Sequence, residues 1–339
     1  MMLKNFKKFT FRALFVGNIL VILLMLLIGN IDWLNPVDYP LLANLGLGYP
    51  ILLVFNFAFL VFWAFVRLRT IWLPVLGFIL CFASIRIYCP FNLPKDKPHG
   101  AIKVLSYNVY MFDSWEETNP KTNPIVNYII DSKADLVCLQ EAQGDGDKSG
   151  GIYKRLKAHY PYFKLMVKKK PGADYMVLLS RYPILWQDTI PYGSSSNQSV
   201  AYMVDIKGTK TLVVNNHFES NGLSNDDKAG FKSLVKGRMR TNKAKSESVH
   251  LLRKLGKVSM RRAPQADMVA RYVKQYLDKK VPVILCGDFN DNPLSYTHRV
   301  IDKELIDCFV ASGNGPGISY HRSGMYFRID HIFCSDDFE

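Results

Sequence analysis

The chain has 339 residues, which leaves room for more than one domain, and its 43 Lys and Arg against 29 Asp and Glu give a formal net charge of +14. Its six cysteines form no CxxC pair and no Cys/His spacing typical of zinc, and the sequence contains no internal repeat. These features argue against a zinc-binding module and a repeat architecture, whereas the cysteines do not indicate a cellular compartment.

Three apolar stretches occupy the N-terminal part of the chain, at residues 13–31, 41–66 and 70–85. Stretches of about 17–25 apolar residues match the hydrocarbon core of a bilayer, so the sequence predicts three transmembrane helices. A cleavable signal peptide is the alternative for the first stretch. That stretch has no Ala-x-Ala cleavage site, and further spans follow it.

Basic residues near these stretches predict the orientation of the chain. One side of the predicted spans carries Lys4, Lys7, Lys8, Arg12, Arg67 and Arg69, whereas the loop 32–39 has no Lys or Arg. The positive-inside rule places the N-terminus in the cytoplasm, and three crossings place the remainder outside. We expect a multi-pass protein of a bacterial-type inner (plasma) membrane whose C-terminal domain is extracytoplasmic, in the periplasm.

The chain divides into three expected parts. Residues 1–88 form a membrane domain, residues 89–100 a stiff proline-containing linker, and residues 101–339 a soluble domain. Within the soluble domain we expect helices over 123–132 and 153–160, a flexible polar loop over 144–151, a strand over 175–179, a loop over 194–197, and a hairpin joining 201–206 to 211–215 through Lys207-Gly208.

Residues 228–262 are unusually basic, with twelve Lys or Arg and one acid, Glu247. They precede an expected helix over 265–277. One interpretation is a solvated helical insertion. The other is an electrostatic patch for an anionic surface, either lipid headgroups or nucleic acid. Because the predicted spans tether the chain to a membrane, we expect a basic amphipathic helix that lies on anionic lipid.

Four short apolar runs of the soluble domain each end in polar side chains. Such runs predict buried strands, and strand ends are places where a rigid scaffold presents functional groups. Each run is followed directly by the residues named after it: 102–107 by Asn108; 136–139 by Gln140 and Glu141; 211–214 by Asn215, Asn216 and His217; and 281–286 by Gly287, Asp288, Phe289 and Asn290.

If these strands end at one edge of packed sheets, their polar side chains form one cluster. Its oxygen donors suit Mg²⁺ or Mn²⁺, ions that bind phosphate oxygens. Phosphoester hydrolysis is the chemistry that this set serves best. The metal neutralises phosphate charge, a carboxylate activates water, and His and Asn donors stabilise the charge of the transition state.

Each of these residues also has an ordinary interpretation when taken alone. Asn108 is consistent with a strand-end cap, Glu141 with a surface acid and His217 with a satisfied core histidine. Asp288 and Asn290 are consistent with an Asx turn. Their occurrence together and in this order is what favours a functional site.

With Arg328-Ile329-Asp330 added, these motifs resemble the endonuclease/exonuclease/phosphatase superfamily in order and rough spacing. That superfamily includes pancreatic-type deoxyribonucleases, abasic-site endonucleases, neutral sphingomyelinases and inositol polyphosphate 5-phosphatases. The resemblance extends from residue 101 to the C-terminus. It implies a four-layer α/β sandwich like that of deoxyribonuclease I, with two mostly antiparallel sheets face to face and helices outside. His rather than Tyr at position 217 looks more like the sphingomyelinase, phosphatase and deoxyribonuclease branches.

The resemblance implies a role for each matching position. Glu141 would be the main metal ligand, and Asn108 would lie beside metal and phosphate. Asp288 would position or deprotonate the attacking water. Asn290 would donate a hydrogen bond to the phosphate, and His217 would steady the phosphoryl oxygens.

The C-terminal part departs from the pattern of the superfamily. Members carry a final Ser-Asp-His motif beyond Arg-Ile-Asp, and this chain has none before Glu339. Asp330-His331 is an alternative candidate for that pair, but the run 328–333 fits the penultimate strand better. Asp330 would then orient the missing histidine. We expect a truncated copy of a longer gene product that is inactive until a Ser-Asp-His segment is restored.

The leading functional hypothesis is a membrane-tethered, Mg²⁺-dependent phosphodiesterase or phosphatase that acts on lipid headgroups or other extracytoplasmic phosphoesters. A nuclease acting on DNA or RNA is the first alternative. The net charge supports it, but no base-stacking aromatic motif is evident. A noncatalytic membrane scaffold is the second. The fold by itself does not choose among substrates.

Overall fold

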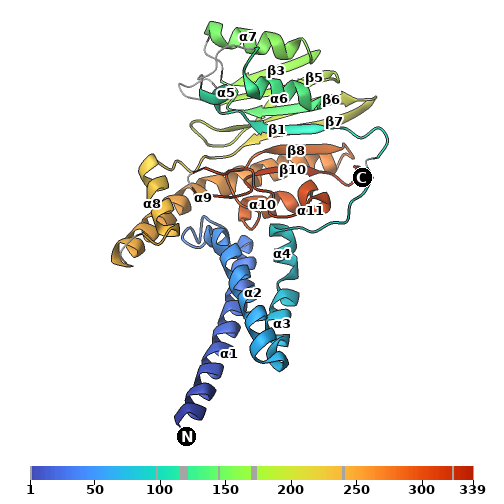
Figure 1. Ribbon diagram of the computed structural model, residues 1–339. Helices are drawn as coiled ribbons and strands as arrows, with labels where there is room; N and C mark the ends of the chain where they lie inside the picture. Colours follow the sequence, from blue (N-terminus) through green and yellow to red (C-terminus); the bar gives the residue numbers. More distant parts are fainter. Residues whose placement is uncertain are drawn as a thin grey trace.

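The structure is a computed structural model, and it describes residues 2–338 except 97, 115–120, 144–145, 169–173, 239–240 and 323. A group of helices built from the first 88 residues projects from one side of a two-sheet α/β unit (Figure 1). The N-terminus lies at the far end of these helices, and the C-terminus lies in the α/β unit.

The projecting group consists of α1 (Met2–Gly29), η1 (Ile31–Trp33), η2 (Leu45–Gly48), α2 (Tyr49–Val66), η3 (Leu68–Thr70), α3 (Trp72–Leu80) and α4 (Phe82–Tyr88). Two of its stretches, Phe6–Trp33 and Leu45–Val66, are long and apolar enough to cross a membrane. Large apolar side chains such as Leu27, Val54 and Phe57 are exposed along them, as expected where lipid covers a helix. The group is therefore suited to a membrane.

The third predicted span is broken. Leu68–Leu80 and Phe82–Tyr88 meet at an angle of 61°, so among the described residues two helices could cross a membrane, or three if this bent pair is one span. Ser84, in α4 after the break, donates its hydroxyl to the Gly29 carbonyl at 2.7 Å, which holds α4 beside the end of α1.

The α/β unit contains two sheets. The first has the strand order β1 (Val104–Asn108), β2 (Leu136–Gln140), β4 (Tyr175–Ser180), β3 (Tyr162–Val167). The second has the order β5 (Ile184–Ile190), β6 (Gln198–Ile206), β7 (Thr209–His217), β8 (Val283–Asp288), β10 (Asp330–Cys334), β9 (Ile306–Asp307). Only the pairs β1–β2 and β7–β8 are parallel, and all other neighbours are antiparallel.

In the described part of this unit, seven helices accompany the sheets: α5 (Tyr110–Ser114), α6 (Pro124–Ser132), α7 (Gly146–Lys157), α8 (Asn225–Val235), α9 (Thr241–Leu277), α10 (Tyr296–Asp302) and α11 (Cys308–Ser312). Three separate apolar cores lie between the layers. One packs α6 and α7 on the first sheet, one fills the space between the sheets, and one packs α9 and α10 on the second sheet. Three cores in succession separate four layers, so the predicted four-layer α/β sandwich is confirmed.

Several of the expected elements are confirmed, and others are not. The helix at 123–132, the strand at 175–179, the loop at 194–197 and the hairpin through Lys207-Gly208 are present. The loop expected over 144–151 is wrong from Gly146 onward, where α7 begins, and residues 144–145 lie outside the described residues. The helix expected from Gln265 already begins at Thr241 and continues through Pro264, because several of its earlier residues, such as Leu251 and Gly256, are buried.

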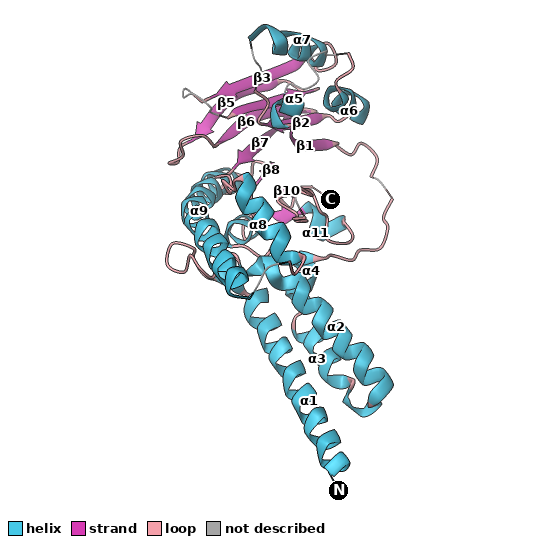
Figure 2. Ribbon diagram, turned by 60° about the vertical axis from the view of Figure 1, so that its left-hand side comes forward, coloured by secondary structure: helices cyan, strands magenta, loops and turns pink. Residues whose placement is uncertain are grey.

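The helices of the first 88 residues contact the α/β unit directly. Asn44 donates to Ser259 on α9 at 3.1 Å, and Arg299 of α10 lies 3.2 Å from Asp32. A side-chain carbon added to Gly256 would lie 2.4 Å from the Pro40 carbonyl oxygen, so α9 touches the loop before α2. These contacts, and not the segment 89–100 alone, hold the two parts of the chain together (Figure 2).

Candidate active site

The polar ends of β1, β2, β7 and β8 meet at one edge of the sandwich. In the parallel pair β1–β2, Asn108 lies opposite Gln140, and in the parallel pair β7–β8, His217 lies opposite Asp288. Parallel neighbours end at the same edge of a sheet, and the face-to-face packing of the sheets brings the two edges together. The structure therefore assembles the strand ends that the sequence singled out.

Asn108 links the two sheets at this edge. Its side-chain nitrogen donates to Glu141 Oε1 at 2.9 Å and to Asp288 Oδ2 at 3.0 Å. Gln140 makes a second link deeper in the sandwich, where it donates to Asn215 Oδ1 at 2.7 Å. Asn216, between Asn215 and His217, takes no part because alternate side chains of a strand point to opposite faces.

The loop after β8 forms a tight turn. The backbone N–H of Asn290 donates to Asp288 Oδ1 at 2.7 Å, so the Asx turn considered for these residues is present. The Asn290 side chain donates to the Phe218 carbonyl at 3.1 Å. Asn290 has φ 52° and Glu141 has φ 49°, both left-handed, which is an unfavourable conformation that often accompanies functional sites. The turn and the site thus use the same residues.

His217 is buried among carboxylates. Its Nδ1 lies 2.8 Å from Asp174 Oδ2, and its Nε2 lies 3.7 Å from Glu141 Oε1. Burial by itself lowers the pKa of His217, but the carboxylates of Asp174, Asp288 and Glu141 together outweigh it and raise the pKa to about 10. The imidazole is therefore positively charged at neutral pH.

Asp174 is the residue that sequence reasoning missed. It also accepts the backbone N–H of Glu141 at 3.1 Å, so one carboxylate holds two members of the site. Asp174 directly precedes β4, which runs antiparallel to β2. The start of β4 therefore lies beside the end of β2. A search of strand starts as well as strand ends would have found this acid.

Asp330 begins β10 directly opposite Asp288 of β8. Ser319 Oγ accepts its backbone N–H at 3.1 Å, and its Oδ1 is buried with no hydrogen-bond partner among the described residues. Burial and the charge of Asp288 raise the pKa of Asp330 to about 7. Asp330 therefore lies at the cluster, as expected, close to a second carboxylate.

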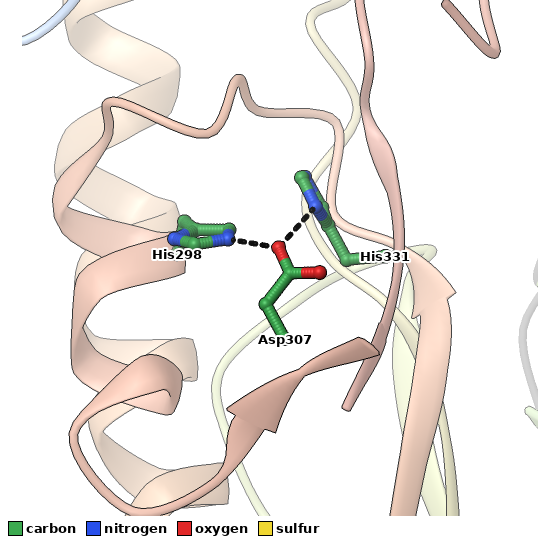
Figure 3. A group of neighbouring side chains, drawn as sticks. All are labelled: His298, Asp307 and His331. Carbon is green, nitrogen blue, oxygen red and sulfur yellow. Dashed lines mark hydrogen bonds and ion pairs between the residues drawn. The ribbon is translucent and has the colours of Figure 1, made fainter. Parts of the chain in front are cut away.

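His331 lies away from this cluster, in a buried group with His298 and Asp307 (Figure 3). His298 Nε2 lies 2.8 Å from Asp307 Oδ2, and His331 Nδ1 lies 4.0 Å from the same oxygen. Arg328 Nη2 also lies 4.0 Å from this oxygen. A guanidinium beside the carboxylate repels a metal cation, so we interpret the group as an ion-pair network that joins α10, β9 and β10. Asp330-His331 is thus not a pair within the candidate site.

The cluster at the sheet edge fits a divalent cation. Two carboxylate oxygens, from Glu141 and Asp288, converge on one amide nitrogen of Asn108, so two anionic oxygen donors lie close together. His217 Nε2 and Asp330 Oδ1 are buried and have no hydrogen-bond partner among the described residues. A hard ion such as Mg²⁺ or Mn²⁺ prefers oxygen donors of this kind.

A four-layer sandwich with carboxylates, amides and an imidazole at one edge defines a class of phosphoester hydrolases. A family model described as the Endonuclease/Exonuclease/phosphatase family matches residues 105–339. The chain belongs to this family, whose members are hydrolytic phosphoesterases that typically use divalent metal ions. A second model, described as Domain of unknown function (DUF8431), matches residues 11–88, and none of the curated proteins matches the sequence.

Solved structures with a similar fold include truncated TDP2 from Caenorhabditis elegans and the human Nocturnin catalytic domain with bound sulfate. Each is 15% identical, with a TM-score of 0.48, and the match covers 69% of this chain and 83% of the other chain. Sphingomyelinase C from Streptomyces griseocarneus is 16% identical with a TM-score of 0.45, covering 72% of this chain and 86% of the other. The family assignment depends on the family match and not on these likenesses.

Proposed function

We propose that this chain is a membrane-anchored phosphoester hydrolase that uses Mg²⁺ or Mn²⁺ and acts on phosphoesters at the outer surface of the membrane. The observation that carries the proposal is the position of Asn108, whose amide nitrogen joins Glu141 and Asp288 across the two sheets. Glu141 and Asp288 lie close together in different surroundings. One of them can therefore bind the ion while the other activates water.

Glu141 and Asn108 would hold the cation, which supplies neutralising charge to the phosphate when it is bound. Asp288 would orient the attacking water and accept its proton, since the N–H of Asn290 fixes the direction of its carboxylate. Asn290, fixed by the Phe218 carbonyl, would lie beside the phosphate.

His217 would supply positive charge to the phosphoryl oxygens. The 2.8 Å contact with Asp174 orients the imidazole and keeps its proton, as a carboxylate does for a histidine in other hydrolases. Asp330, opposite Asp288, would modulate the protonation of that acid because two close carboxylates do not ionise independently.

The basic segment 228–262 supports a location at an anionic surface. Its exposed cations include Lys232, Lys243, Lys245, Lys257 and Arg261 on α8 and α9. Arg262 is different: it is fully buried and lies 2.9 Å from Asp291, so it braces the loop after β8 and does not contribute to a surface patch. We propose that the exposed cations bind anionic lipid headgroups, with nucleic acid as the alternative partner.

Hydrolysis of bis-p-nitrophenyl phosphate by the full-length natural protein in nanodiscs tests the proposal. We expect turnover with Mg²⁺ or Mn²⁺ and none after chelation with EDTA. Glu141→Gln should lower turnover at least about hundredfold, because loss of a ligand costs more than loss of its supporting partner. Asp131→Asn, the same chemical change at an exposed position on α6, should leave turnover unchanged.

Binding of Mn²⁺, followed by electron paramagnetic resonance, gives a readout that does not need turnover. Glu141→Gln should weaken binding at least about tenfold, and Asp131→Asn should not. Mn²⁺ binding equal in all three proteins would remove Glu141 as a ligand. Absence of turnover together with absence of Mn²⁺ binding would favour a noncatalytic scaffold, and turnover confined to DNA or RNA would favour a nuclease.

A further inference from the structure

A cavity of about 250 Å³ lies between the candidate site and the start of the second apolar stretch. One of its walls includes Asn290, and another includes Leu47, which belongs to the stretch Leu45–Val66 that is suited to cross a membrane. The rest of the lining combines apolar side chains from α8, α9 and the segment before β10 with polar ones that include Lys228, Asp291 and Asn292. The apolar side chains are Phe231, Leu251, Leu255, Met325, Phe327 and Ile329.

The walls of this cavity are held in place by contacts between distant parts of the chain. Asn44, which lines it, donates to Ser259 of α9 at 3.1 Å. Asp291, also in the lining, forms the 2.9 Å ion pair with buried Arg262. The rings of Phe231 and Phe327 meet edge to face at 6.5 Å. The cavity is therefore a formed feature of the junction and not a space left by loosely packed loops.

We propose that this cavity binds a hydrocarbon chain of a membrane lipid whose phosphoester lies at Asn108, Glu141 and Asp288. Three observations point to this ligand. Most of the lining area is apolar, Leu47 of the stretch suited to cross a membrane contributes to it, and so does Asn290 of the candidate site. A lipid has the same polarity pattern, with apolar chains joined to a phosphate.

The size of the cavity limits what it binds. Pockets for small organic ligands span about 300–1,000 Å³, so about 250 Å³ suits part of one chain and not a whole lipid. The remaining chain would stay in the bilayer beside α2. Each methylene group removed from water favours binding, so longer chains should be preferred over short ones.

The inference rests on the proposed hydrolase function, because the phosphoester of the lipid is the substrate of that hydrolase. Binding of the lipid chain in the cavity can be tested separately. The probe is phosphatidylglycerol with a diazirine at the end of one acyl chain, mixed into phosphatidylcholine nanodiscs that hold the full-length natural protein. After irradiation, mass spectrometry should find the label on peptides that contain 251–255 or 325–329. Labelling confined to residues 1–88 outside 44–47 would overturn the inference.

Leu255→Trp fills the cavity, and Leu252→Trp is its matched control on a neighbouring position of α9 outside the lining. Leu255→Trp should reduce labelling of the lining at least fivefold, while Leu252→Trp should keep it. If Leu255→Trp does not fold, Phe231→Ser on the less buried α8 gives the same readout by making the wall polar. Labelling that is equal in the wild type and in a folded cavity variant would also overturn the inference.

Hydrolysis separates the two proposals. Leu255→Trp should lower the ratio of kcat/KM for a 16-carbon over a 4-carbon phosphodiester lipid at least tenfold. Leu252→Trp should leave that ratio and the hydrolysis of bis-p-nitrophenyl phosphate within twofold of wild type. An unchanged ratio in an active enzyme would reject the chain site while the hydrolase proposal stands. Labelled lining residues without any metal-dependent hydrolysis would reject the hydrolase proposal while the lipid site stands.

Discussion

Asp174 Oδ2 lies 2.8 Å from His217 Nδ1, and Asp174 Oδ1 accepts the backbone N–H of Glu141 at 3.1 Å. One buried carboxylate at the start of β4 thus positions a histidine of the second sheet and a glutamate of the first. Asn108 and Gln140 make further hydrogen bonds between the two sheets, and apolar side chains fill the space between them. A hydrogen-bonded acid with two partners fixes their relative position at the site.

The first prediction concerns this pair and pH. Asp174→Asn should destabilise the protein by about 3–5 kcal/mol at pH 6.5, as expected when one partner of a buried ion pair is removed. The pKa of folded His217, about 10, exceeds the unfolded value of about 6.5. The contribution of the pair is therefore complete below about pH 6.5 and is lost as pH rises through about 10, by up to about 1.4 kcal/mol per pH unit.

Thermal unfolding of wild type and Asp174→Asn in detergent, followed by intrinsic fluorescence, measures this effect. The difference in Tm between the two proteins should narrow between pH 6.5 and pH 10. The difference between wild type and Asp131→Asn should stay constant over the same range. A difference in Tm between wild type and Asp174→Asn that does not change with pH would contradict a charged His217.

The second prediction concerns Gly287, where β8 passes close to β7. Its φ is +142°, and a side-chain carbon at this position would lie 1.9 Å from the Asn216 carbonyl oxygen. Gly287→Ala should therefore lower the free energy of unfolding by at least about 3 kcal/mol or prevent folding, since it combines overpacking with a strained backbone.

Gly208→Ala is the control for Gly287. Gly208 has φ +89° in an exposed turn, and nothing lies within 4 Å of an added carbon. Gly208→Ala should lower the free energy of unfolding by only about 1 kcal/mol, because only the backbone conformation is unfavourable for alanine. Similar losses of Tm in the two variants would show that the contact with Asn216 does not matter.

The third prediction concerns the basic segment. Lys232, Lys243 and Lys257 should react with an acetylating reagent at least about threefold more slowly in nanodiscs with phosphatidylglycerol than in pure phosphatidylcholine, because anionic headgroups pair with them. Lys279, exposed in the turn that follows the C-terminal end of α9, should react equally in both. Equal rates for all four lysines would show that the segment does not face the headgroups.

The fourth prediction concerns orientation. The start of α1 and the end of α2 lie away from the α/β unit, whereas the end of α1 and the start of α2 lie beside it (Figure 2). Arg67 and Arg69 are at the far end, so the positive-inside rule places that end in the cytoplasm. Alkaline phosphatase fused after residue 339 should be active in a bacterial host, and the same fusion after Val66 should be inactive. The reverse pattern would place the α/β unit in the cytoplasm.

Much of the α/β unit could be predicted from the sequence. The strands that end in Asn108, Glu141, His217 and Asp288 are apolar runs with abrupt polar ends, and this contrast is local. β3 and β5 were not predicted, because they are only partly buried and their residues alternate weakly. The extent of α9 was also missed, since its early turns are helical through contacts with the loop before α2.

The sequence by itself determined the apolar N-terminal stretches, the order of the polar motifs and the four strand ends, because each depends on residues close together along the chain. Only the tertiary structure decided that Asp174 completes the site, that His331 belongs to a different cluster from Asp330, and that a cavity joins Asn290 to Leu47. These relationships depend on strand direction, on which face of a strand a side chain occupies, and on the docking of helices against the sandwich. All three bring together residues that are distant in sequence, so no local sequence pattern can predict them.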